Sequence, residues 1–129
     1  TQNLPSDFFR EALEIPPAAS FNLCLFWDFL NFLDENLINS FASFLKPYLD
    51  KNCRAHAFAV HNVKSMPSQH VYGLADLKTI TSRPRQKYID APNPPTLKMI
   101  QETFHCFKFD RNIMLTDNRI EISMFKNNN

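Results

Sequence analysis

Residues 21–32, Phe-Asn-Leu-Cys-Leu-Phe-Trp-Asp-Phe-Leu-Asn-Phe, decide the fold that we predict for this chain. The stretch opens with an apolar run and ends on Asp28, with Asn31 three residues later. Strands that are buried on both faces of a parallel sheet read as continuous apolar runs. In open α/β sheets, ligands bind just beyond the carboxyl ends of such strands. Asp28 is therefore expected to be either a functional carboxylate or the cap of the helix that follows.

Around this stretch, the chain alternates between predicted strands and predicted helices. We expect strands at 21–27, 54–60, 78–81, 112–116 and 119–125, and helices at 35–49, 66–76 and 96–107. This alternation predicts an α/β domain with three layers, in which helices cover both faces of a mainly parallel sheet of four or five strands. The strands at 21–27 and 112–116 are expected to be parallel neighbours at its centre.

The domain is expected to span residues 21–125. A lead-in with a short helix would occupy residues 1–20, and a tail would occupy residues 126–129. Two of the predicted helices carry apolar stripes at helical spacing, which places their side chains in the core. The predicted core residues on these helices are Leu37, Phe41, Phe44, Leu97, Ile100 and Phe104.

Composition excludes several classes of function. Gly73 is the single glycine, so the glycine-rich loops that bind dinucleotide cofactors or P-loop nucleotides are not expected. The formal net charge of +1 creates no global field for nucleic acid. No apolar run approaches the length of about 20 residues that a membrane span needs. Three cysteines without a close pair predict reduced thiols, which are typical of the cytoplasm or nucleus.

Two predicted strands end on acids, the first on Asp28 and the fourth on Asp117. If these strands are neighbours, the two carboxylates meet at one edge of the sheet, and a cation between them would allow both to stay ionised. Oxygen ligands with open positions favour Mg²⁺ or Mn²⁺. The alternatives are that Asp28 caps a helix, that Asp117 belongs to a turn, and that Asn31 bonds to nearby backbone.

The apolar strand followed by Asp28 and Asn31 resembles the opening motif of the NYN domains, a branch of the PIN-like ribonucleases. Asp117 matches in place the acid of their later motif. The resemblance covers about residues 21–118, and it implies a PIN-like fold that cuts RNA with Mg²⁺ or Mn²⁺. Asp28 and Asp117 would then hold the metal, and Asn31 would orient a water or a ligand.

The resemblance also contains two departures. Arg119 stands where the family usually has a further acid. The start of the helix at 96–107 lacks the family's acid, and Asp90 is the nearby substitute as a metal ligand. The resemblance therefore implies an RNA-processing or RNA-silencing factor with weak or lost nuclease activity.

The proline-rich loop at 82–95 carries the residues that we consider for RNA contact: Arg83, Arg85, Lys87 and Tyr88. Tyr88 would stack on a base, and the three cations would neutralise phosphates. The alternative for this loop is a plain solvated surface. The alternative for the whole chain is a non-catalytic domain that recruits a protein partner, and a third hypothesis is an unrelated small α/β enzyme.

Overall fold

The computed structural model describes residues 8–61, 70–86 and 94–129. The helical elements are α1 (Phe8–Ala12), η1 (Phe29–Phe32), α2 (Glu35–Leu45), η2 (Lys46–Tyr48) and α3 (Leu97–Thr103). The strands are β1 (Phe21–Trp27), β2 (Leu49–Val60), β3 (His70–Asp76), β4 (Thr79–Pro84), β5 (Phe107–Met114) and β6 (Arg119–Lys126). None of the helices in these ranges has the length and apolar character that a bilayer crossing needs.

The main sheet has the strand order β1-β2-β6-β5, and its pairing is mixed. β1 pairs with β2 in parallel through the crossover that contains α2, whereas β6 pairs antiparallel with both β2 and β5. The predicted mainly parallel sheet is therefore wrong. The strand predicted at 112–116 overlaps the end of β5, which lies at the opposite edge from β1 and is not its neighbour.

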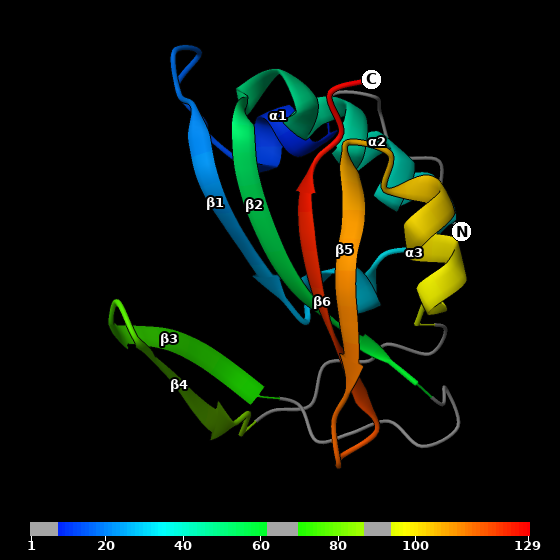
Figure 1. Ribbon diagram of the computed structural model, residues 1–129. Coiled ribbons are helices and arrows are strands. Elements are labelled where there is room, and N and C mark those ends of the chain that lie inside the picture. The colour runs from blue at the N-terminus through cyan, green and yellow to red at the C-terminus, as the bar shows by residue number, and fades with distance from the viewer. Residues whose placement is uncertain (1–7, 62–69, 87–93) are drawn as a thin grey trace.

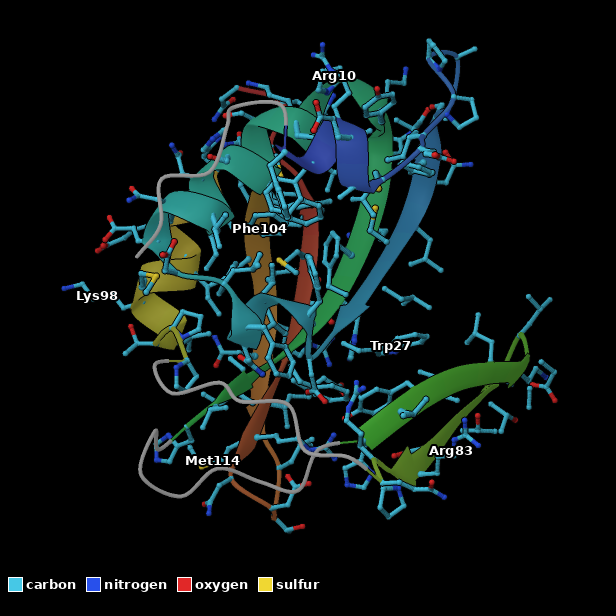
Figure 2. The ribbon with its side chains drawn as sticks, turned by 180° about the vertical axis from the view of Figure 1, so that it is seen from behind. Arg10, Trp27, Arg83, Lys98, Phe104 and Met114 are labelled. Atoms are coloured by element: carbon cyan, nitrogen blue, oxygen red, sulfur yellow. The ribbon has the colours of Figure 1, made fainter. Side chains whose placement is uncertain are left out.

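Helices α1, α2 and α3 pack on the same face of the main sheet, behind it in Figure 1 and in front of it in Figure 2. Alternate residues of β2 and β6 point into this layer, as their alternating burial shows. The predicted cover of helices on both faces is thus wrong for the described residues. The other face carries polar pairs, among them Arg54 with Asp110 at 2.9 Å and His56 with Glu121 at 3.5 Å.

The helical stripes placed the core correctly. Phe41, Ile100 and Phe104 are buried, and Leu37, Phe44 and Leu97 are partly buried against them. Phe104 lies between the helices and the sheet in Figure 2, and it stacks on Phe41 with ring centroids 5.9 Å apart. The stripe of α2 ends early, because Pro47 falls in the short helix η2 that follows.

The helix predicted at 66–76 is wrong where the structure describes it, because residues 70–76 form β3. This strand pairs with β4 in a separate two-stranded sheet. The hairpin projects beside the end of β1 (Figure 1). Its side chains are mostly exposed, with Leu77 fully so at its tip. Val71, Leu74 and Ala75 at helical spacing misled the prediction, because this segment forms a strand whose second half is exposed and buries no helical face.

Candidate functional site

The chain turns sharply where β1 ends. Trp27 has a φ of 49°, in the left-handed region that a bulky residue rarely adopts. Asp28 follows as the first residue before η1, but its side chain makes no capping hydrogen bond there. The cap of α2 is instead Asp34, whose Oδ1 accepts from the backbone N–H of Leu37 at 2.9 Å. The capping alternative for Asp28 is therefore not realised, and its carboxylate remains available.

Asp28 lines a pocket of about 430 Å³ between the end of β1, helix η1 and the start of the β3–β4 hairpin. Aromatic side chains form much of the wall. The lining residues are Phe26, Trp27, Asp28, Phe29, Phe32, His70, Val71, Tyr72 and Arg85. This is the region beyond the carboxyl end of a parallel strand, where ligands bind in open α/β sheets.

Tyr72 attaches the hairpin to the main sheet. Its ring stacks on Trp27 at a centroid distance of 5.5 Å, and it lies 5.5 Å from the ring of Phe58. Figure 2 shows Trp27 pointing toward the hairpin. Trp27 and Tyr72 line the pocket and offer apolar surface on which a flat ligand can pack, while Phe58 lies against Tyr72 outside the lining.

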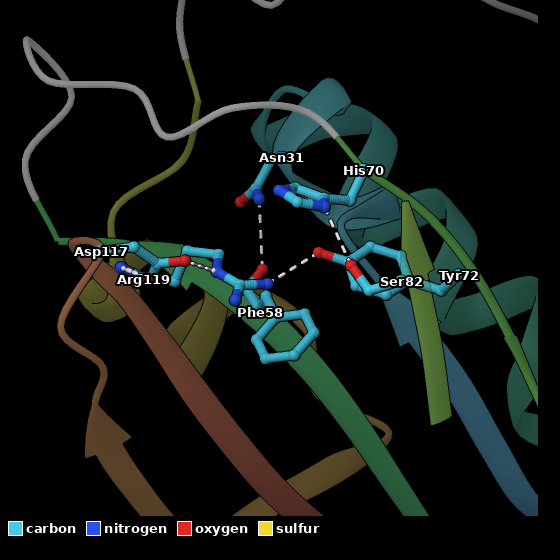
Figure 3. A network of polar contacts seen from close by, with 7 residues as sticks. All are labelled: Asn31, Phe58, His70, Tyr72, Ser82, Asp117 and Arg119. Atoms are coloured by element: carbon cyan, nitrogen blue, oxygen red, sulfur yellow. Dashed lines mark hydrogen bonds and ion pairs between the residues drawn. The ribbon is translucent and has the colours of Figure 1, made fainter. Parts of the chain in front are cut away.

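A polar network connects the pocket to the β5–β6 turn (Figure 3). Arg119 Nη1 donates to the hydroxyl of Tyr72 at 2.7 Å, and Arg119 Nε donates to Asp117 Oδ2 at 2.6 Å. The guanidinium also lies 4.4 Å from the ring centroid of Phe58, in cation–π geometry. Arg119 is thus fixed from three sides.

Burial and the neighbouring side chains act on the pKa of the Asp28 carboxyl in opposite directions. Burial raises its pKa above the ordinary value of 3.8. A hydrogen bond with Tyr72 and the charges of Arg119, His70 and Arg85 oppose this shift without cancelling it. A carboxylate whose pKa is raised in this way becomes a better proton acceptor near neutral pH.

Asn31 holds η1, the short helix after Asp28, against the main sheet. It is buried, and its Nδ2 donates to the carbonyl oxygen of Phe58 on β2 at 3.2 Å. The bond holds η1 against the end of β2, and its acceptor lies 27 residues away in sequence, so it is not the nearby backbone that the sequence alternative named. Its Oδ1 is buried without a hydrogen-bond partner among the described residues.

The structure places Arg119 and Tyr72 between the two predicted carboxylates. Asp117 lies in the turn after β5, where its Oδ1 also accepts from the backbone N–H of Arg119 at 3.2 Å. It therefore serves the turn and Arg119, and it is linked to Asp28 through Arg119 and Tyr72. Within the described residues, no group of three or more His, Cys, Asp or Glu side chains is arranged to hold a metal ion. Asp90, the third predicted metal ligand, lies outside these residues.

The predicted RNA-contact residues have different surroundings. Arg83 is exposed on β4 and borders a shallow hollow on the hairpin. Arg85 is half-buried and lines the Asp28 pocket. Lys87 and Tyr88 lie outside the described residues.

Sequence reasoning missed Trp27, Tyr72, His70 and the role of Arg119. Trp27 directly precedes Asp28, so the sequence could have predicted that Trp27 belongs to the site. Tyr72 and His70 were hidden by the assignment of their segment to a helix. Arg119 was noted as a departure from a family motif, when its partners are Asp117 and Tyr72.

No protein-family model matches the sequence, and no curated protein matches it either. Solved structures do resemble the fold. The pyocyanin biosynthetic protein PhzM aligns with a TM-score of 0.53 and 11% identity, over 84% of this chain and 31% of PhzM. An inferred O-methyltransferase of Nostoc punctiforme PCC 73102 aligns with a TM-score of 0.52 and 14% identity, over 84% of this chain and 32% of that protein.

A third similar structure is the glycopeptide N-methyltransferase MtfA complexed with S-adenosyl-L-homocysteine. It aligns with a TM-score of 0.52 and 9% identity, over 98% of this chain and 60% of MtfA. The chain thus spans between about a third and three fifths of these proteins. At such identities the likeness shows the fold, which is methyltransferase-like.

These comparisons overturn the predicted membership in the NYN domains. The PIN-like fold, the RNA-processing or RNA-silencing function and the RNA partner were expected from that resemblance, and all are wrong by this finding. The expected Mg²⁺ or Mn²⁺ is wrong as well, since the bound molecule in the MtfA structure is a nucleoside derivative. The alternative of a non-catalytic protein-recruiting domain gains no specific support. A motif of one acid and one amide after a strand is too short to separate these folds.

Proposed function

We propose that this chain forms one wall of a methyl-transfer site, with Asp28 as the group that accepts a proton from the methyl acceptor. The observation that carries the proposal is the position of Asp28. It is a half-buried carboxylate at the carboxyl end of a parallel strand, inside an aromatic pocket, in a methyltransferase-like fold. The chain spans only part of its structural neighbours, so we assign it the wall and not the complete site.

The pocket residues fit part of an S-adenosyl ligand. Aromatic faces attract a cationic centre and pack on a flat base, and the Asp28 carboxylate carries the charge opposite to a sulfonium. Gly73, the single glycine, lies in β3, where an added Cβ would meet Thr81 Oγ1 at 3.1 Å. It therefore belongs to the hairpin ladder and does not cradle a ligand. An S-adenosyl donor, when bound, supplies an electrophilic methyl group on sulfur.

The residues of this chain would act on the acceptor. Asp28 would take the proton from an acceptor hydroxyl or amine as the acceptor's oxygen or nitrogen forms its bond to the methyl carbon and the carbon–sulfur bond breaks. The raised pKa of Asp28 suits this task. Tyr72, itself held by Arg119, would keep the carboxylate in place. The proton would then leave from Asp28 to solvent.

The proposal includes an intracellular location, cytoplasmic or nuclear. Its support is the state of the thiols. Cys24 and Cys53 lie side by side with their sulfurs 3.8 Å apart, and both are free, as is Cys106. Adjacent reduced thiols are typical of a reducing compartment.

The test compares two nucleosides that differ by one charge. Trp27 is the sole tryptophan and lines the pocket, so its fluorescence reports binding there. We expect S-adenosylmethionine, a sulfonium, to bind several-fold more tightly than neutral S-adenosylhomocysteine. Asp28→Asn should remove that preference, and the control Asp110→Asn, at an ion pair remote from the pocket, should keep it. If neither nucleoside changes the fluorescence at millimolar concentration, the proposal is wrong.

A further inference from the structure

Arg85 is a half-buried cation that the proposed proton transfer does not use. It follows β4 and lines the same pocket as Asp28. Among the residues that the structure describes, its buried Nε has no hydrogen-bond partner and no carboxylate lies within ion-pair distance of its guanidinium. Removing a charge from water is costly unless an opposite charge or hydrogen bonds compensate. The Asp28 carboxylate acts on Arg85 from beyond ion-pair distance. An anion that enters the pocket would add a charge in direct contact and the missing hydrogen bonds.

The neighbouring cation Arg83 shows that this is not a general property of the hairpin. Arg83 lies two residues earlier, is exposed, and borders hollows on the hairpin and not the Asp28 pocket. Arg119, the other arginine near Asp28, already has Asp117 as its ion-pair partner. Arg85 is therefore the arginine in the described part of the pocket that has room for a ligand.

The remaining walls define the body of that ligand. Phe26, Phe29 and Phe32 face the same space as Trp27 and Tyr72. Aromatic side chains favour flat apolar rings through offset and edge contacts. A guanidinium binds carboxylate and phosphate groups through paired hydrogen bonds. The pocket thus combines a surface for a ring with one anchor for an anion.

We propose that the Asp28 pocket binds an aromatic anion, with its ring against the aromatic wall and its carboxylate or phosphate on Arg85. The inference rests on the proposed function in one respect, that this molecule is the methyl acceptor. Its hydroxyl or amine would then face Asp28. Arg85 is a specificity-determining residue, because it selects the charged molecule over a neutral one of the same shape.

The experiment titrates the wild-type chain with three probes and follows Trp27 fluorescence. Benzoate and phenyl phosphate carry the anion, and benzamide is the neutral analogue of benzoate. We expect one or both anions to bind roughly 10–100-fold more tightly than benzamide, the range of a charged hydrogen-bonded contact. The anion that binds more tightly identifies the acceptor's charged group. Inorganic phosphate alone should displace neither.

Three variants locate the effect. Arg85→Gln should reduce the preference for the anions to near unity, and Arg85→Lys should retain part of it, because charge survives without the planar fork. Arg83→Gln is the matched control and should behave as wild type. Circular dichroism checks that each variant is folded, and Arg85→Lys keeps the test decisive if Arg85→Gln does not fold.

Equal affinities for benzoate, phenyl phosphate and benzamide would overturn the inference. So would a preference that Arg83→Gln removes as fully as Arg85→Gln, or displacement of the anions by inorganic phosphate at similar concentration. The two proposals fail separately. If the adenosyl nucleosides bind but the anion preference is missing, the inference about Arg85 alone is wrong. If the anion preference holds but neither nucleoside binds, the pocket is an aromatic-anion site without methyl transfer.

Discussion

Asp28 and Asp117 follow strands in the same way along the sequence, yet the fold gives them opposite surroundings. Asp28 follows a strand whose partner is parallel, so the chain leaves the sheet and a crevice opens beyond the strand end. Asp117 lies in the tight turn of an antiparallel hairpin, where the next strand returns at once and Arg119 occupies both oxygens. An acid after a strand is thus a site candidate only when the chain does not turn straight back.

The end of β1, before Asp28, and the end of β5, before Asp117, should differ most in how much they contribute to stability. Leu30, in η1 beside Asp28, is fully buried, whereas Met114, at the end of β5 before Asp117, is 57% exposed. Leu30→Ala should cost about 2–5 kcal/mol of unfolding free energy, because it leaves a cavity under the pocket. Met114→Ala should stay within about 0.5 kcal/mol. Urea denaturation measures both, and equal losses would mean that the two ends are equally packed.

The stability of the protein should depend on pH through Asp28. The folded state raises the pKa of Asp28, so it binds this proton more tightly than the unfolded chain does. Stability from this group is therefore present below the ordinary value of 3.8 and is lost as pH rises through the folded pKa. Asp28→Asn should melt a few degrees above wild type at pH 7, and the gain should vanish below about pH 4. A variant that melts lower at pH 7 would contradict the burial of this carboxyl.

The Tyr72 hydroxyl contacts both Asp28 and Arg119, so its removal should have an effect of intermediate size. Tyr72→Phe keeps the ring between Trp27 and Phe58 but removes the acceptor for Arg119 and the hydrogen bond to Asp28. We expect a loss of about 0.5–1.5 kcal/mol and a further rise in the Asp28 pKa. A titration of the carboxyl by NMR measures the second effect. An unchanged pKa would show that the hydroxyl does not reach Asp28 in solution.

The smallest expected effect belongs to Asp117. Its side chain is 43% exposed, and exposed ion pairs contribute little. Asp117→Asn should cost about 0.2–1 kcal/mol, with a shallow dependence on salt. Thermal melts at low and high ionic strength measure this. A loss above about 2 kcal/mol would mean that the fold depends strongly on the Arg119 network, and the two acids would then not differ in their surroundings as described.

Two local signals in the sequence predicted local features correctly, whereas the apolar spacing at 66–76 did not. The apolar run placed β1 and the position of Asp28, and the stripe of Phe41 and its neighbours placed the buried face of α2. These features depend on periodicity within one element. The aromatic wall around Trp27 was not predicted, because half of it comes from a hairpin far along the chain.

Strand order was beyond the reach of these signals, since a strand carries little information about its partner. One signal was nevertheless present. The sequence Asp117-Asn118 between two apolar alternations is typical of a tight hairpin. In the structure Asn118 has a φ of 69°, in the left-handed region that asparagine tolerates. This feature predicts that β5 and β6 pair antiparallel, which excludes a crossover between them and places Asp117 in a turn.

The position of β1 at the sheet border has a consequence for handling the protein at high concentration. Within the described residues no strand pairs with its outer side, and its seven residues contain no charge or proline. Leu23 on this border is 57% exposed. The unpaired backbone N–H and C=O groups of such an edge strand can pair with a strand from another molecule. Self-association that rises with concentration should therefore begin here, and Leu23→Lys should suppress it without touching the pocket.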